Sequence, residues 1–308
     1  MGIPWYLGRR DLPMLKRLTA PAGLRTEIET LVRDGVVVVE NALQPELCDA
    51  LRESFSTAEL KHPSVFEPQK DPAGHYPRIV NIHALFPEFI QAFTRGPRVQ
   101  GVCDFMFGAE TVVYTSLYYE SGSQQDIHRD TPYFWTEPGW RYLGVWAALE
   151  DADETNGPLN VVRGGHLLPE PDRRAVRRRF FPDGAEFDPL SMDTWLAYQG
   201  EVQAACKRAG LRQETVPVRK GDVIIWHPSL PHGGAPITDP ARTRHSMVMH
   251  VVPVGTPVRG QEVFFDPDTV QSPKAHWSYA ARDGRRYVKF DHMSFAHRHE
   301  IGADDLRG

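Results

Sequence analysis

Residues 111–120, TVVYTSLYYE, mark the point at which the periodicity of the chain changes. Before them, apolar residues recur three and four apart, as in helices, whereas after them β-branched and aromatic residues form short runs with the period of strands. Five more runs follow, separated by Gly, Pro, Asp and Asn: RYLGVWAALE (141–150), PLNVV (158–162), ETVPVR (214–219), DVIIWH (222–227) and SMVMHVV (246–252). They lack intervening helices of βαβ spacing, which favours an antiparallel sandwich or barrel over a parallel sheet.

The segment before this β-rich region has helical spacing. We expect a helix over 22–34 that ends at Gly35, a strand at Val36–Val39 and a second helix within 41–57. The polar, Pro-rich stretch 58–78 is typical of an irregular surface loop, and one or two helices should follow over about 87–107.

One segment interrupts the strands. Residues 167–212 include PDRRAVRRRFF and SMDTWLAYQGEVQAACKRAG, and the second of these has clear helical character. We interpret 167–212 as a helical insertion on the β core that serves as a lid or substrate wall. In the C-terminal part we expect a strand at YVKFDHM (287–293).

Composition excludes several classes of function. The 308 residues are 41% hydrophobic and 24% charged with a net charge of −5, which is typical of a globular protein and gives no basic field for nucleic acid. Residues 1–18 are broken by Pro and charges before an apolar run develops, so we expect no signal peptide, no membrane span and a cytoplasmic location. The sparse cysteines, Cys48, Cys103 and Cys206, suit a reducing compartment and should be packing residues.

A candidate metal-binding pair lies in IHRDTP (127–132). His128 and Asp130 are two residues apart, so they share one face of an extended segment and can reach one ion. Among the other histidines, context selects His232 in GDVIIWHPSLPHGGAP (221–236), because it follows an apolar strand and precedes two glycines that allow close backbone approach. Two histidines and one carboxylate form the ligand set of non-haem Fe(II) oxygenases.

Arg244 adds a second element to this site. On the strand that follows it, Arg244, Ser246 and His250 share one face. An arginine that points into an apolar barrel is costly unless it meets an anion, so a dicarboxylate cosubstrate bound by Arg244 and by the metal would account for it, with Ser246 as a further donor. The alternative is that Arg244 faces solvent on an edge strand.

Taken in order, the motifs resemble the phytanoyl-CoA dioxygenase family of Fe(II)/2-oxoglutarate oxygenases. Along the chain these motifs are RIVNIHALFPEF (78–89), His128-x-Asp130, WAALEDADETNGPLNVVRGGH (146–166), GDVIIWHPSLPHGG (221–234) and TRHSMVMH (243–250). The resemblance, which runs from about Asp34 to about Pro253, implies a mainly β fold with a double-stranded β-helix (jelly-roll, cupin-like) core, N-terminal helices and a helical insertion.

We therefore expect a single domain over 1–308. Its parts are a mainly helical N-terminal scaffold (1–110), a jelly-roll core (111–166 and 213–253), the insertion (167–212) and a C-terminal extension (254–308).

The resemblance implies Fe(II) bound by His128, Asp130 and His232, and 2-oxoglutarate bound by an arginine and by Trp146. The family's spacing for that arginine falls on Thr243 here; Arg244 fits the following strand better, and Arg242 is the alternative. Gly234 stands where relatives often have a serine, for which Ser246 or Thr243 would substitute. Asp130 is retained, whereas halogenating relatives have Ala or Gly there, which favours hydroxylation.

Substrate-facing residues are harder to select. Gln125 and Tyr118 are expected to face the metal cavity, and Asn81 is a weaker candidate. The aromatic side chains after the ligand pair could form a substrate wall or part of the core: Tyr133, Phe134, Trp135 and Trp140. The arginines between Arg173 and Arg179 could bind an anionic substrate, although such a run is more often a solvated helix face. We interpret the remaining histidines of the motifs as packing or surface residues: His166, His227, His245 and His250.

The expected function is an Fe(II)- and 2-oxoglutarate-dependent dioxygenase that uses O2, hydroxylates a small molecule, and releases succinate and CO2. The alternatives are a cupin-like isomerase with another metal, and a binding or sensor protein that keeps the fold without the chemistry. The sequence does not give the oligomeric state.

Overall fold

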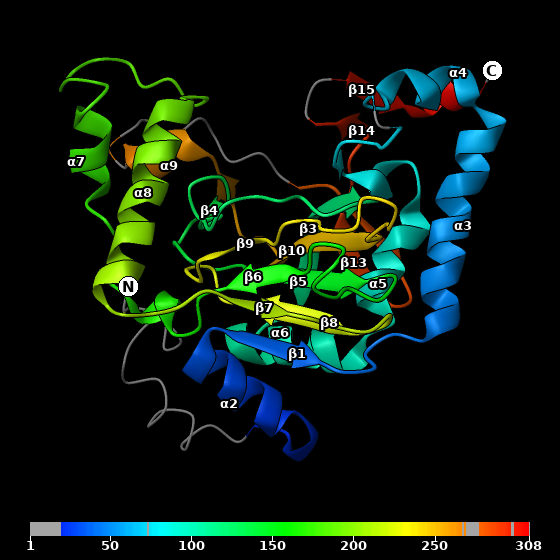
Figure 1. Cartoon of the computed structure of the whole chain (residues 1–308), viewed down its shortest axis with the longest axis horizontal. Coiled ribbons are helices and arrows are strands. Elements are labelled where there is room, and N and C mark those ends of the chain that lie inside the picture. The colour runs from blue at the N-terminus through cyan, green and yellow to red at the C-terminus, as the bar shows by residue number, and fades with distance from the viewer. Residues whose placement is uncertain (1–19, 73, 267, 269–276, 297–298, 308) are drawn as a thin grey trace.

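The structure, a computed structural model, describes residues 20–72, 74–266, 268, 277–296 and 299–307. A large, mainly antiparallel sheet runs through the centre (Figure 1). Its strand order is β1 (Val36–Val39), β8 (Val223–Trp226), β5 (Leu143–Ala148), β10 (Ser246–Pro253), β3 (Thr111–Tyr119), β2 (Ile79–Val80), β14 (His292–Phe295) and β15 (His299–Gly302). Within the described residues, no helix is long and apolar enough to cross a membrane.

A second, smaller sheet faces the central part of the large one. It consists of β7 (Glu214–Val216), β6 (Leu159–Val161) and β9 (His232–Gly234), paired in that order. Buried side chains from both sheets, including Trp146, Ile224 and Val161, form one hydrophobic cluster. Two facing antiparallel sheets with this core are the predicted jelly roll.

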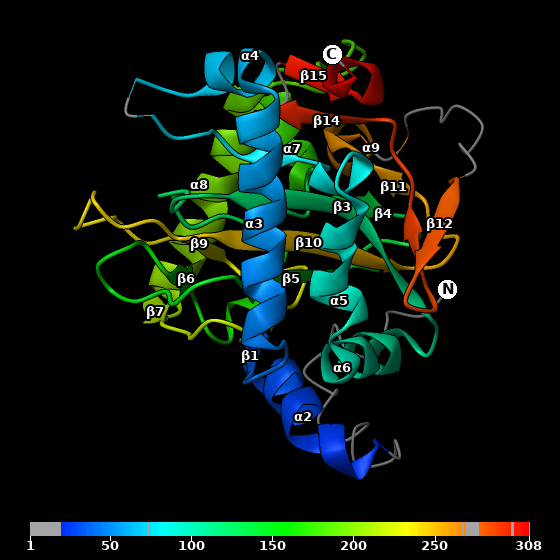
Figure 2. The same cartoon turned by 90° about the vertical axis from the view of Figure 1, so that its right-hand side faces the viewer.

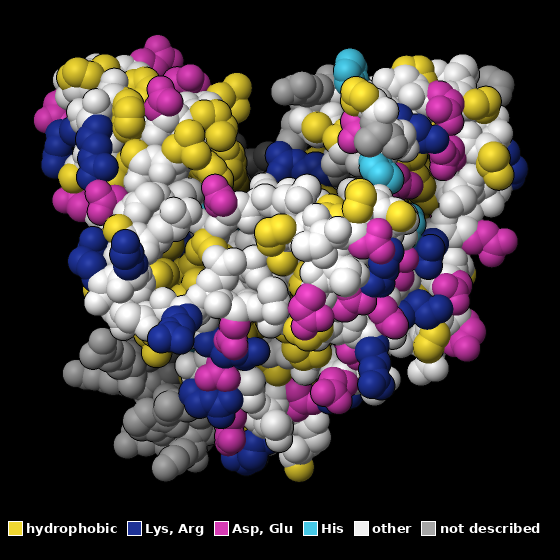
Figure 3. All heavy atoms as spheres, in the orientation of Figure 1, with side chains coloured by type: hydrophobic (Ala, Val, Ile, Leu, Met, Phe, Trp, Pro, Cys, Tyr) yellow, Lys and Arg dark blue, Asp and Glu magenta, His cyan; other side chains and the backbone are white. Residues whose placement is uncertain are grey.

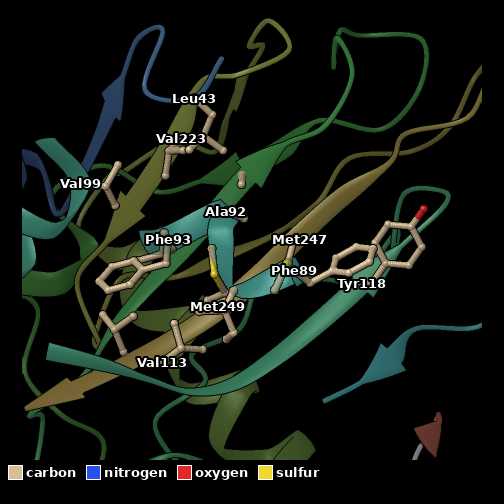
Figure 4. Packing of buried hydrophobic residues seen from close by; sticks show 14 of the residues in the cluster. Leu43, Phe89, Ala92, Phe93, Val99, Val113, Tyr118, Val223, Met247 and Met249 are labelled. Carbon is tan, nitrogen blue, oxygen red and sulfur yellow. The ribbon is translucent and has the colours of Figure 1, made fainter. Parts of the chain in front are cut away.

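Helices cover the other face of the large sheet. They are η2 (Ala22–Leu24), α2 (Arg25–Asp34), α3 (Pro45–Lys61), η4 (Ile82–Ala84), η5 (Pro87–Ile90), α5 (Gln91–Thr94) and α6 (Pro97–Phe107). Figure 2 shows α3, α5 and α6 in front of the strands. Their apolar side chains pack on sheet residues such as Met247 and Met249, as Figure 4 shows. Burial of this surface, at about 25 cal/mol per Å² of apolar area, is the main force that holds the layers together.

Strand β10 has two distinct faces, as the alternation of its sequence predicts. Met247 and Met249 lie in the helix-covered core, whereas Ser246 and His250 point toward the smaller sheet. The metal and cosubstrate residues therefore lie between the two sheets.

The insertion forms two helices, α7 (Arg173–Arg178) and α8 (Met192–Arg208), after η6 (Gly165–Leu167). Ser191 caps α8 by accepting a hydrogen bond from the backbone N–H of Thr194. Together with α9 (Gln261–Phe265), α7 and α8 form a lobe at one side of the sheets (Figure 1). A short pair, β4 (Trp135–Thr136) and β11 (Val258–Arg259), lies next to α9.

Two expectations need correction. The stretch 58–78 is not irregular throughout, because α3 continues to Lys61 and α4 (Pro63–Phe66) and η3 (Glu67–Gln69) follow. Helix α3 buries Phe55 against Phe66 and Tyr76, so tertiary packing extends a segment that its polar composition assigned to a loop.

The expected single strand at 287–293 is in fact two. Strand β13 (Arg285–Val288) pairs with β12 (Tyr279–Arg282) and, through Tyr287, with Val113 of β3. Strand β14 begins at His292 and pairs with β2, and η7 (Ala303–Leu306) follows β15.

Candidate metal centre and cosubstrate pocket

His128, Asp130 and His232 come together between the two sheets, and their ligand atoms all lie within 4.8 Å of one another. The Nε2 atom of His128 is 3.4 Å from Oδ1 of Asp130, and that of His232 is 3.3 Å from Oδ2. Each side chain is largely withdrawn from solvent. This donor set, two imidazoles and one carboxylate, suits a divalent transition metal and leaves further coordination positions for other ligands.

Backbone pairing fixes the distance between the ligands. The N–H of His128 donates to the carbonyl of His232 at 2.8 Å, and the N–H of His232 donates back at 2.9 Å. This close approach requires glycine after His232: a Cβ atom on Gly233 would lie 2.5 Å from the carbonyl oxygen of Gln125. Thr131 adds a side-chain tie, since its hydroxyl donates to the carbonyl of Pro228 at 2.8 Å.

Backbone carbonyls orient both imidazoles. Nδ1 of His128 lies 2.7 Å from the carbonyl oxygen of Asp126, and Nδ1 of His232 lies 3.0 Å from that of Leu230. A carbonyl accepts only from a protonated nitrogen, so each Nε2 keeps its lone pair and points toward the site. This is the tautomer that a metal-binding histidine needs.

His250 holds the carboxylate of Asp130. Its Nε2 lies 3.0 Å from Oδ2 of Asp130, and its ring stacks on Phe134 at 3.7 Å between centroids. The interpretation of His250 as a packing or surface residue is therefore corrected. The sequence did contain evidence for this role, because the alternation of the strand places His250 on the same face as Arg244 and Ser246.

The charge state of Asp130 follows from these contacts. Burial by itself would raise the pKa of this carboxyl group, but the imidazoles of His232, His128 and His250 outweigh burial and hold its pKa well below the ordinary value. Asp130 is thus an anionic ligand at neutral pH.

The insertion helix α8 also contacts the ligand-bearing segment. The side-chain amide of Gln199 accepts from the N–H of Arg129 at 2.9 Å and donates to its carbonyl at 3.0 Å. Gln203 donates to the carbonyl of Ile127 at 2.7 Å, and Trp195 lies 5.9 Å from His128 between ring centroids. The predicted lid is therefore also a support for the metal ligands, which sequence reasoning did not anticipate.

Arg244 lies between the sheets, not at a solvent-exposed edge. Its side chain is 2% exposed, one guanidinium nitrogen donates to the carbonyl of Gly157 at 2.8 Å, and its Nε has no partner within the described chain. Burial lowers the pKa of Arg244 to about 10, which still leaves it charged at neutral pH. A buried cation with an unused donor favours an anionic ligand beside it.

Several side chains surround the guanidinium of Arg244. It lies 5.3 Å from the ring centroid of Trp146 and 5.9 Å from that of Tyr119. The hydroxyl of Ser246 is fully buried and has no partner among the described residues. Arg242, the alternative anchor, is instead bound to Asp153 and Thr155 at the surface.

Of the two residues expected to face the metal cavity, Gln125 lines a cleft and Tyr118 does not. The cleft that Gln125 lines has a volume of about 680 Å³. Tyr118 is corrected to Tyr119: Tyr118 packs on Phe55 and Phe89 in the helix-covered core, and its hydroxyl contacts His245. Strand β3 is buried on both faces. Its sequence therefore lacks the alternation of polar and apolar residues that would show which side chains face the metal site.

The other candidates have structural contacts. Asn81 accepts a hydrogen bond from Thr115, and Trp135 stacks with Arg173. Four arginines of the insertion pair within the protein: Arg173 with the Phe264 carbonyl, Arg174 with Asp268, Arg177 with Asp266 and Arg179 with Glu201. These contacts favour the structural reading of the arginine run.

Known proteins resemble this chain in sequence and in fold. Residues 31–246 match the model of the family described as phytanoyl-CoA dioxygenase (PhyH). The phytanoyl-CoA dioxygenase domain-containing protein 1 of Danio rerio is 27% identical over 175 residues, which cover 56% of this chain and 55% of the relative. The chain thus spans about half the length of that relative.

Solved structures share the fold. The 2-oxoglutarate-dependent carbocyclase SnoK from nogalamycin biosynthesis superposes with a TM-score of 0.59 at 16% identity, over 89% of this chain and 98% of its own. EctD from S. alaskensis, with 2-oxoglutarate and 5-hydroxyectoine, gives a TM-score of 0.53 at 17% identity, over 76% and 77%.

Proposed function

The chain belongs to the phytanoyl-CoA dioxygenase family, and from this premise we propose that it is an Fe(II)- and 2-oxoglutarate-dependent dioxygenase that hydroxylates a small molecule. His128, Asp130 and His232 hold the iron. Arg244 and Ser246 bind the far carboxylate of 2-oxoglutarate beside Trp146. The cosubstrate thereby spans the distance between the buried cation and the metal.

The observation that carries this proposal is that a three-ligand metal site and a buried arginine with unused donors occur together between the two sheets. The three-ligand site would suit several metalloenzymes, including a zinc or manganese isomerase. The metal ligands alone leave the buried Nε of Arg244 and the Ser246 hydroxyl without partners in the described chain. An anionic cosubstrate that also binds the metal satisfies both features.

Each residue has a defined task in this reaction. The carbonyls of Asp126 and Leu230 keep the imidazoles aimed at the metal, and His250 keeps the carboxylate of Asp130 in place. Bound Fe(II) supplies the redox chemistry by which O2 converts 2-oxoglutarate to succinate and CO2 and oxidises the substrate. The lobe of α7, α8 and α9 limits access of water to the site.

The retained carboxylate supports hydroxylation over halogenation. Asp130 would serve as a metal ligand where a halogenating enzyme would need a free position for halide, and its hydrogen bond with His250 holds the carboxylate in place. The oxygen atom transferred to the substrate then comes from O2.

Formation of succinate tests the proposal. Purified protein supplied with Fe(II), ascorbate, O2 and 2-oxoglutarate should release succinate slowly without substrate, and Asp130→Ala should release none because it binds iron poorly. Zinc in place of iron should give no succinate. Absence of succinate from the wild-type protein, together with no binding of 2-oxoglutarate to its iron form, would refute the proposal.

A further inference from the structure

The cleft that Gln125 lines, three residues before His128, contains a cation for which the described residues show no ion pair. Arg78 lines the cleft together with Tyr119, Gln125 and Arg242. Arg78 is half-buried, and no ion pair joins it to a carboxylate anywhere in the described residues. Arg242, by contrast, is bound to Asp153. A partly desolvated guanidinium that lacks a counter-ion favours an anion from solution.

Strand register brings Arg78 close to the proposed cosubstrate pocket. Strand β2 pairs with β3 so that Ile79 lies opposite Tyr118, which sets Arg78 opposite Tyr119. Burial raises the pKa of Tyr119, and the charges of Arg78 and Arg244 partly offset that rise. Tyr119 therefore lies within electrostatic reach of both arginines, one of them in the pocket and the other in the cleft.

The cleft is also lined by an acidic residue. Among the described lining residues, Asp71 is the acidic one, and it accepts a hydrogen bond from the backbone N–H of His75. The position of Arg78 is fixed from the backbone side, since its carbonyl accepts from the N–H of Ala296 at 2.9 Å.

Aromatic and apolar side chains lie close to the candidate metal ligand His128. Figure 3 shows the surface hollowed between the lobe of α7–α9 and the lobe of α4, β14 and β15, with hydrophobic side chains on the first and basic side chains within the hollow. Trp195 packs near Tyr133 at 6.1 Å between ring centroids and close to His128. Leu196 and Met192 on α8 are 55% and 52% exposed. The apolar part of a ligand that packs on Trp195 would therefore lie close to His128.

We propose that the substrate carries a carboxylate or phosphate group, that Arg78 binds this group in the cleft, and that the apolar part of the substrate lies against Trp195 and Tyr133. This inference rests on the proposed function, because it assigns the substrate of that site. A cleft of about 680 Å³ holds a small molecule of that kind. Arg78 is thus a substrate-binding residue, distinct from Arg244, which binds the cosubstrate.

Small probes of matched length test the inference. Hexanoate, hexyl phosphate and neutral hexanamide are titrated anaerobically into the Fe(II) protein saturated with 2-oxoglutarate, and binding is followed by tryptophan fluorescence. We expect one or both anionic probes to bind at least tenfold more tightly than hexanamide. Whichever of hexanoate and hexyl phosphate binds more tightly identifies the anion. Equal affinity for the charged and neutral probes would overturn the inference.

Variants assign the effect to one residue. Arg78→Gln should abolish the preference for the anionic probe, Arg78→Lys should retain part of it, and Arg242→Gln, in the same cleft but paired with Asp153, should leave it unchanged. Loss of the preference in Arg242→Gln with its retention in Arg78→Gln would contradict the assignment.

Binding of 2-oxoglutarate separates this inference from the proposed function. Arg78→Gln should bind 2-oxoglutarate with the affinity of the wild-type protein, because Arg244 and not Arg78 binds the cosubstrate. If Arg78→Gln instead loses 2-oxoglutarate, Arg78 belongs to the cosubstrate pocket and the inference fails. If the wild-type protein does not bind 2-oxoglutarate but still prefers the anionic probe, the proposed function fails and the anion site stands.

Discussion

Nε2 of His250 lies 3.0 Å from Oδ2 of Asp130, the same carboxylate oxygen that approaches Nε2 of His232 at 3.3 Å. The Nδ1 atom of His250 is buried and has no partner within the described residues, so its proton is on Nε2 and is donated to Asp130. The stacked ring of Phe134 keeps the imidazole in the required plane. His250 is therefore a positioning residue for a metal ligand.

Removal of this contact should weaken metal binding without removing a ligand. His250→Phe keeps the stack with Phe134 but leaves Asp130 free to rotate, and such contacts with ligands typically contribute about 10-fold to 100-fold to metal affinity. Titration of Fe(II) into the metal-free protein under nitrogen measures this. His250→Gln, which retains a donor, should recover part of the affinity, and affinity equal to wild type in His250→Phe would show that the contact has no positioning role.

Gln199 should affect the metal from the insertion helix. Gln199→Ala leaves the buried N–H and carbonyl of Arg129 unpaired, which costs about 1–3 kcal/mol per group and loosens the segment between His128 and Asp130. We expect a lower free energy of unfolding in urea and weaker Fe(II) binding. Gln203→Ala is the matched control, because Gln203 is exposed and water can replace its bond to Ile127. Equal effects of the two variants would contradict this role.

His83 should make stability depend on pH. It is buried between the hydroxyl of Ser116 and the carbonyl of Val288, and burial lowers its pKa from 6.5 to about 4. Between these values the unfolded chain binds a proton that the folded protein does not, so this histidine makes stability fall as the pH falls from about 6.5 to about 4. The difference corresponds to on the order of 3 kcal/mol.

Urea unfolding at several pH values measures the contribution of His83. His83→Gln removes the titrating group, so the difference in unfolding free energy between wild type and variant should shrink as the pH falls from 6.5 toward 4. A difference that stays constant over this interval would show that folding does not change the pKa of His83.

The sequence predicted the candidate metal ligands best where the two residues are close together in the chain. His128 and Asp130 are two residues apart, and their shared face follows from the period of an extended segment alone. The alternation of the strand predicted that Arg244 and Ser246 share one face, and both side chains are buried in the structure. His250 was on that face too, but its partner lies 120 residues away, which no local pattern reveals.

The contacts of the insertion were beyond sequence reasoning for the same reason. Gln199 reaches Arg129 across 70 residues, and its helical pattern shows only that α8 is a helix, not which face meets the ligand-bearing segment. The choice of Tyr118 over Tyr119 failed because a strand buried on both faces carries no alternation to read.

Anaerobic titration of the Fe(II) protein with 2-oxoglutarate, followed by visible absorption, tests the central claim most directly. The account predicts a new metal-to-ligand absorption band in the wild-type protein that saturates at one cosubstrate per iron. Arg244→Ala should bind 2-oxoglutarate at least about 30-fold more weakly, as expected when one partner of a buried charge pair is removed. Arg242→Ala should match the wild type, since Arg242 is bound to Asp153 at the surface. No band in the wild-type protein, or loss of the band in Arg242→Ala with its retention in Arg244→Ala, would contradict the account.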